Sequence, residues 1–72
     1  MNFRTKEQIL EEQPSIERKI EFRGNKYKLI NTVHDVSHGG IEDLTCYTYR
    51  NETENAEILL YVQQGKIVIV EL

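Results

Sequence analysis

The stretch from Ile16 to Val33 does most to limit how this 72-residue chain can fold. Its apolar residues alternate with polar ones on both sides of a Gly-Asn pair, and this period of two is typical of strands with one buried face. Gly24 and Asn25 favour the positive φ angles that a two-residue hairpin turn requires. The pattern therefore predicts a β-hairpin over about residues 16–33.

If Gly24 and Asn25 form the loop, they also fix the register of this hairpin. The apolar residues of the two strands then meet on one face, and a slip of one residue would move all of them to the opposite face. The expected pairs are Phe22–Tyr27, Ile20–Leu29, Ile16–Val33 and, on the charged face, Glu21–Lys28.

A short helix is predicted ahead of the hairpin, over about residues 5–13. Thr5 followed three residues later by Gln8 is a weak capping box, and Pro14 disfavours helical geometry at the residue before it. An alternative begins a helix at Pro14 with Ile16 on its apolar face, but the alternation further along fits a strand better.

Three segments follow the first hairpin. Residues 34–40 contain aspartate, serine and two adjacent glycines, which favours a loop that can move. Residues 41–50 are rich in threonine and tyrosine and are predicted to form a third strand. Residues 56–72 are predicted to form a second hairpin that turns at Gln64 and Gly65. Its expected pairs are Val62–Ile67, Leu60–Ile69, Tyr61–Val68 and Leu59–Val70.

The second hairpin is apolar on both faces, unlike the first. An antiparallel sheet with one solvated face should alternate apolar and polar residues, so strands that are apolar on both faces need cover on both sides. Either the sheet closes on itself, or a partner surface covers the second face. The candidate interface residues are those that share the face of the aromatic side chain: Leu59, Tyr61, Val68, Val70 and Leu72.

The expected fold is α+β and rich in β-structure, with a short N-terminal helix followed by a five-stranded antiparallel meander. The alternative is a meander curled into a small SH3-like or OB-like barrel, an analogy of strand count that carries no function. The chain is long enough for one domain, residues 1–72.

Composition limits the kinds of partner and the compartment. Charged residues make up 29% of the chain and the formal net charge is −3, which weakens a general case for nucleic-acid binding. No run of apolar residues reaches membrane-spanning length and the first residues resemble no secretion signal, so we expect no membrane contact and a cytoplasmic location.

Two sets of residues are candidates for chemical sites, and the pattern around each argues against that role. His34 and His38 stand four apart, but the neighbouring glycines argue against a helix that would let them share a metal ion. Cys46 is the single cysteine and could pair with a histidine as a nucleophile, although a cysteine in mid-strand is more often a small buried apolar residue. We therefore expect no catalytic residue, no metal and no cofactor.

The leading functional hypothesis is a small non-enzymatic protein-interaction module. It would self-associate as a homodimer, or regulate or inhibit a protein partner, through the C-terminal hairpin. The alternative is a single-stranded nucleic-acid-binding domain in which bases stack on aromatic side chains beside a cation. Its contact residues would be Tyr47, Tyr49 and Arg50.

Overall fold

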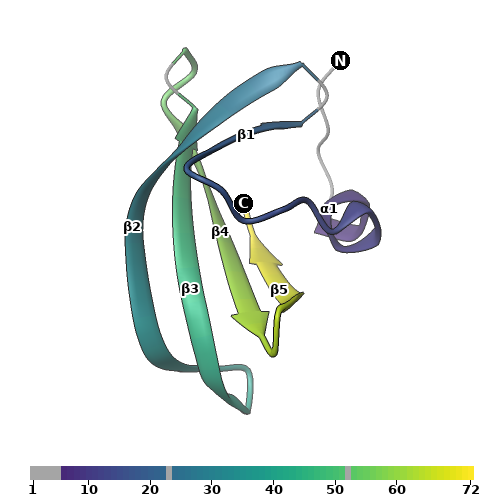
Figure 1. Cartoon of the computed structure of the whole chain (residues 1–72), viewed down its shortest axis with the longest axis vertical. Helices are drawn as coiled ribbons and strands as arrows, with labels where there is room; N and C mark the ends of the chain where they lie inside the picture. Colours follow the sequence, from purple (N-terminus) through teal and green to yellow (C-terminus); the bar gives the residue numbers. More distant parts are fainter. Residues whose placement is uncertain (1–5, 23, 52) are drawn as a thin grey trace.

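A computed structural model describes residues 6–22, 24–51 and 53–72, in which one short helix accompanies a five-stranded antiparallel sheet (Figure 1). The strands lie in the order in which they occur along the chain, and the sheet curls into a half-barrel. This confirms the prediction of an N-terminal helix and a five-stranded meander. The elements are α1 (Lys6–Glu12), β1 (Lys19–Phe22), β2 (Asn25–His38), β3 (Ile41–Asn51), β4 (Ala56–Gln63) and β5 (Lys66–Glu71).

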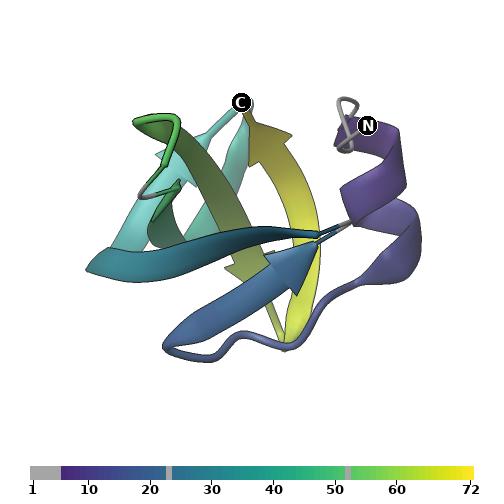
Figure 2. The ribbon, with the colours of Figure 1, turned by 90° about the horizontal axis from the view of Figure 1, so that it is seen from above.

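Helix α1 ends where proline predicts. Gln13, just before Pro14, has a left-handed φ of 49°, and its N–H donates to the carbonyl oxygen of Ile9 at 2.9 Å. Ile9 is buried and Leu10 packs beside it, so the apolar side chains of this short helix gain their stability from the sheet. Figure 2 shows α1 beside β5. Thr5, the predicted capping residue, lies outside the described residues.

The register predicted for the first hairpin is wrong by two positions. β1 ends at Phe22 and β2 already begins at Asn25, so the turn comes one residue earlier than expected. Gly24, with a φ of 83°, therefore supplies the positive angle at the second loop position and not at the first. A shift of two keeps every side chain on its predicted face. The observed pairs are Phe22–Asn25, Glu21–Lys26, Ile20–Tyr27 and Lys19–Lys28, and the predicted Ile16–Val33 pair does not form.

The predicted loop over residues 34–40 is wrong, because strand β2 continues to His38. Only Gly39 and Gly40 form the turn, and both take positive φ angles, as a tight two-residue hairpin demands. The loop-like composition instead produces irregular pairing, with two register shifts between Val33 and His38 and a left-handed φ of 59° at Asp35. Such bulges strengthen the local twist and bend the strand.

The turn between β3 and β4 is stabilised by the side chain of Asn51. The buried Asn51 side chain accepts hydrogen bonds from the N–H groups of Thr53 and Glu54 at 2.9 and 2.7 Å. This asparagine turn satisfies backbone donors that would otherwise lack a partner.

The second hairpin keeps its predicted register only next to the turn. The pair Val62–Ile67 is confirmed, but an extra residue on β5 then displaces the rest. Val70 consequently joins the face of Leu60, while Ile69 joins the face of Tyr61. The predicted pairs Leu60–Ile69, Tyr61–Val68 and Leu59–Val70 are wrong; the observed ones are Leu60–Val70, Tyr61–Ile69 and Leu59–Glu71.

Each face of the sheet has an apolar cluster. The inner cluster lies on the face that α1 covers, and its buried members are Ile9, Tyr27, Tyr49, Ile58, Leu60, Ile67 and Val70. The outer cluster lies on the opposite face, and its members are Leu44, Cys46 and Tyr61 with the half-buried Val36, Ile41, Leu59, Val68 and Ile69.

The cover of the outer cluster comes from the chain itself. Val36 and Ile41 belong to the tip of the β2–β3 hairpin, whereas Val68 and Ile69 belong to β5. A Cβ atom on Gly39, at the turn, would lie 4.0 Å from the Ile69 side chain. The bulged tip therefore curls over the outer face of the C-terminal hairpin and leaves Leu44 with no exposed surface.

Candidate functional site

The predicted interface residues of the C-terminal hairpin do not form one exposed patch. Tyr61 and Val70 are 7% and 1% exposed, and the register shift places them on opposite faces. Leu59 and Val68 are half-buried on the outer face, and Leu72 is 55% exposed. The surface left for a partner is therefore smaller than the sequence pattern predicts.

A polar cluster fastens the hairpin tip to the C-terminal strand. His38 Nε2 lies 2.6 Å from Glu71 Oε2, and the Tyr61 hydroxyl donates to Glu71 Oε1 at 3.3 Å. The His38 and Tyr61 rings meet edge to face, with 4.6 Å between their centroids. No sequence pattern indicates this cluster, because its members lie on three different strands.

Burial raises the pKa of Tyr61 to about 12. The neighbouring Cys46 and Glu71 side chains act in the same direction, because each favours the neutral phenol that donates a hydrogen bond. The outer cluster therefore holds Tyr61 as a protonated donor.

The other titratable candidates do not come together as a catalytic or metal site. His34 is exposed on β2, while His38 is engaged with Glu71. Cys46 is a free, buried thiol on β3. In residues 6–22, 24–51 and 53–72, no group of three or more histidine, cysteine or acidic side chains is placed to hold a metal ion.

The three residues of the nucleic-acid alternative are separated by the sheet. Tyr49 is fully buried on the inner face, where its hydroxyl donates to the Glu17 carbonyl oxygen at 2.6 Å and burial raises its pKa. Tyr47 packs half-buried against the same inner cluster. Arg50 points to the outer face, where it forms a 3.3 Å ion pair with Glu57. No shared surface is available on which bases could stack beside this cation.

The open edge of β2 is the most exposed part of the sheet. β1 has four residues and pairs only with Asn25 to Lys28; one further bond joins the Leu29 N–H to the Arg18 carbonyl oxygen. Beyond it, no strand in the described part of the chain pairs with this side of β2. Residues 30–35 are all exposed, including Ile30 at 48% and Val33 at 45%. The sequence pattern missed this edge because the predicted hairpin covers β2 as far as Val33, and because residues 34–40 look like a loop.

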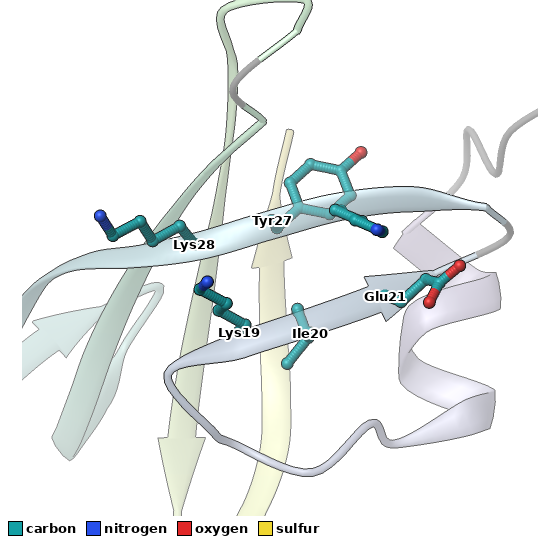
Figure 3. Close-up of a pocket in the computed structure, with 6 residues that line it drawn as sticks. Lys19, Ile20, Glu21, Tyr27 and Lys28 are labelled. Atoms are coloured by element: carbon teal, nitrogen blue, oxygen red, sulfur yellow. The ribbon is translucent and has the colours of Figure 1, made fainter.

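A row of basic residues crosses the outer face at the first residue of β1. Lys19 pairs with Lys28, and Lys28 in turn pairs with Arg50, so three cations face the same side on adjacent strands. Figure 3 shows the Lys19 and Lys28 side chains extending side by side. Like charges directly opposite each other destabilise a sheet. The row ends at Glu57, which is paired with Arg50.

No protein-family model, curated protein or solved structure matches this chain. The search for membrane segments, made over the described residues, finds no helix with the length and apolar character to span a bilayer. The functional argument therefore depends on the chemistry of the surfaces described above.

Proposed function

We propose that this protein is a small non-enzymatic protein-interaction module that binds an extended segment of a partner along the open edge of β2. The observation that carries the proposal is the unpaired edge of β2 beyond Leu29, on the strand that exposes Ile30 and Val33. In strand addition, main-chain hydrogen bonds supply affinity and alternate side chains supply specificity. Exposed edge strands are otherwise a hazard that proteins tend to cover.

The C-terminal hairpin has less support as the binding surface. The tip of the β2–β3 hairpin already covers part of its outer face, and Val70 packs on the inner one. Self-association through Leu59, Val68 and Leu72 is therefore retained as a competing outcome of the test.

Single-stranded nucleic-acid binding through Tyr47, Tyr49 and Arg50 has the least support, because Tyr49 is buried and lies on the opposite face from Arg50. Base stacking requires an accessible aromatic face. Neither tyrosine offers one on the surface that carries the cation.

Two finer parts of the proposal rest on general features. Five antiparallel strands curled into a half-barrel support a relation to small SH3-like or OB-like barrels. A cytoplasmic setting suits the single free thiol of Cys46, since disulfides are rare in that compartment.

The test is selection of twelve-residue peptides from a random library, followed by amide chemical-shift mapping of the best binder. We expect the largest shifts between Ile30 and His38. The double variant Ile30→Thr/Val33→Thr should weaken binding while staying folded, because it removes exposed apolar side chains from the edge without changing its charge. The matched control is Val68→Thr, on the half-buried outer face of β5.

The mapping distinguishes the competing outcomes. Shifts centred on Leu59, Val68 and Leu72 would move the site to the C-terminal hairpin. A concentration-dependent mass in sedimentation, with the same residues shifted, would favour a homodimer. Failure to select any binding peptide would count against the interaction module as a whole.

A further inference from the structure

We infer that the segment received by the open edge of β2 is acidic, and that Arg18, Lys19 and Lys28 recognise its carboxylates. The inference rests on the proposed function and adds the chemical class of the partner. Its starting point is a depression of about 460 Å³ at the place where β1 stops pairing with β2. The residues around it are Arg18, Lys19, Lys28, Leu29, Ile30, Asn31 and Thr32.

The charge around this depression is entirely positive. Its three ionisable lining residues are Arg18, Lys19 and Lys28, all of them exposed. Within the described part of the chain none of these three forms an ion pair, whereas Arg50, the next cation in the row, is paired with Glu57. The chain as a whole has a net charge of −3, so this local cluster of cations is opposite in sign to the net charge of the protein.

The position of the cations matches the path of an added strand. The bond from Leu29 N–H to the Arg18 carbonyl oxygen is the last one between β2 and the segment that precedes it. A partner strand that paired with β2 from Ile30 onward would occupy the same side of β2 as β1. The end of that strand nearest to β1 would lie beside Arg18 and Lys19. Carboxylates there would offset the repulsion between Lys19 and Lys28, which are directly opposite each other.

An acidic peptide fits this surface better than a nucleic acid does. The open edge offers backbone N–H and C=O groups that another peptide backbone can pair with in register. Among the described residues, Tyr47 and Tyr49 pack on the inner face and give this face no aromatic platform for single-stranded bases. A second copy of the chain fits less well for electrostatic reasons. The β2 strand of a second copy would bring Lys26 and Lys28 against only one acidic residue, Asp35.

The test measures the binding of three labelled twelve-residue peptides by fluorescence anisotropy. All three alternate valine with a second residue, which is glutamate, threonine or lysine. We expect the glutamate peptide to bind at least about tenfold more tightly than the threonine peptide, and the preference to shrink at high salt as exposed charges are screened. The lysine peptide should not bind measurably.

Two variants connect the preference to the named residues. Lys19→Thr/Lys28→Thr should reduce the preference for the glutamate peptide to about threefold or less, because the local charge is removed while strand-forming residues remain. The matched control Lys66→Thr lies at the β4–β5 turn and should leave the preference unchanged. Circular dichroism and sedimentation establish that each variant is folded.

The outcomes separate the inference from the proposed function. Equal binding of the glutamate and threonine peptides would overturn the acidic partner and leave the interaction module standing, while failure of all three to bind would overturn both. A single-stranded oligonucleotide is included as a competitor. Displacement of the glutamate peptide by a lower concentration of oligonucleotide than of free peptide would overturn the inference in favour of a nucleic acid.

Discussion

The two edges of this sheet differ in how much of their backbone the rest of the chain covers. The edge formed by β5 is covered by α1 and by the residue that follows it, while the edge of β2 beyond Leu29 is open among the described residues. Both edges carry apolar side chains, so composition does not separate them. The difference lies in what the N-terminal segment covers.

The edge of β5 is covered in part by the Gln13 side chain, which makes hydrogen bonds that a neighbouring strand would otherwise make. The Gln13 amide donates from Nε2 to the Ile67 carbonyl oxygen and accepts from the Ile67 N–H through Oε1, both at 3.0 Å. These two bonds imitate the exchange that a neighbouring strand residue would make. The comparison shows that the N-terminal segment covers the edge of β5, whereas the edge of β2 beyond Leu29 has no such cover among the described residues.

The largest expected effect comes from the same substitution placed on each edge strand. Val70→Ala on β5 removes two methyl groups from a site that is 1% exposed, and should cost about 2 kcal/mol of unfolding free energy. Val33→Ala on β2, at a site that is 45% exposed, should cost less than about 0.5 kcal/mol. Urea denaturation measures both. Similar losses of unfolding free energy in the two variants would show that β2 is part of the stabilising core, and would contradict the proposed difference between the two edges.

Removing the amide cover of β5 should have the next largest effect. Gln13→Ala loses both bonds to Ile67 and should cost about 1 kcal/mol, since the backbone groups of Ile67 lose their partner at a site that is only part-buried. Gln63→Ala is the matched control, because that glutamine makes one exposed hydrogen bond to the Glu42 carbonyl oxygen. Sedimentation should also show a rise in mass for Gln13→Ala alone, as the uncovered edge pairs with other chains.

High pH should weaken the attachment of β5 to the hairpin tip. The pKa of Tyr61 is raised from 10.0 to about 12 in the folded chain, so between these values the unfolded chain loses a proton that the folded chain keeps. The contribution of Tyr61 to stability is therefore complete below pH 10 and is lost as the pH rises toward 12. Chemical denaturation across this range should give a steeper fall for the wild type than for Tyr61→Phe. Parallel curves would contradict this account of the outer cluster.

The smallest expected effect is on the reactivity of the single thiol. Cys46 is buried under the hairpin tip, so a thiol reagent should modify it slowly in the native protein. Glu71→Gln weakens the contact with His38 and should speed modification several-fold with little loss of global stability. An unchanged rate would show that the tip is held by apolar packing and not by this polar contact.

Local pattern predicted most of the elements but not their exact pairing. Alternation and turn residues identified the helix, both hairpins and the third strand, because each of these depends on neighbours along the chain. The turn beside Gly24 was misplaced by one residue, since either flanking residue could have completed the loop. The bulge on β5 after Ile67 was not predictable, because it depends on packing against both faces of β4.

The candidate sites depended even more on information that the sequence does not carry. Residues 34–38 have the composition of a loop, yet β3 provides a long partner that holds them as a bulged strand. This assignment hid the open edge of β2 and the cover that its tip gives to Tyr61. The row of Lys19, Lys28 and Arg50 likewise appeared only once the register was fixed.

The strict succession of strands also has a consequence for how the molecule is assembled. Each strand pairs with its neighbours in the chain, and short connections close at small entropic cost. The contact between Gln13 and Ile67, by contrast, spans 54 residues. We therefore expect folding to proceed from hairpin to hairpin, with helix docking as the last event. During synthesis on the ribosome, the Gln13 amide could not form its bonds to Ile67 until β5 had been synthesised.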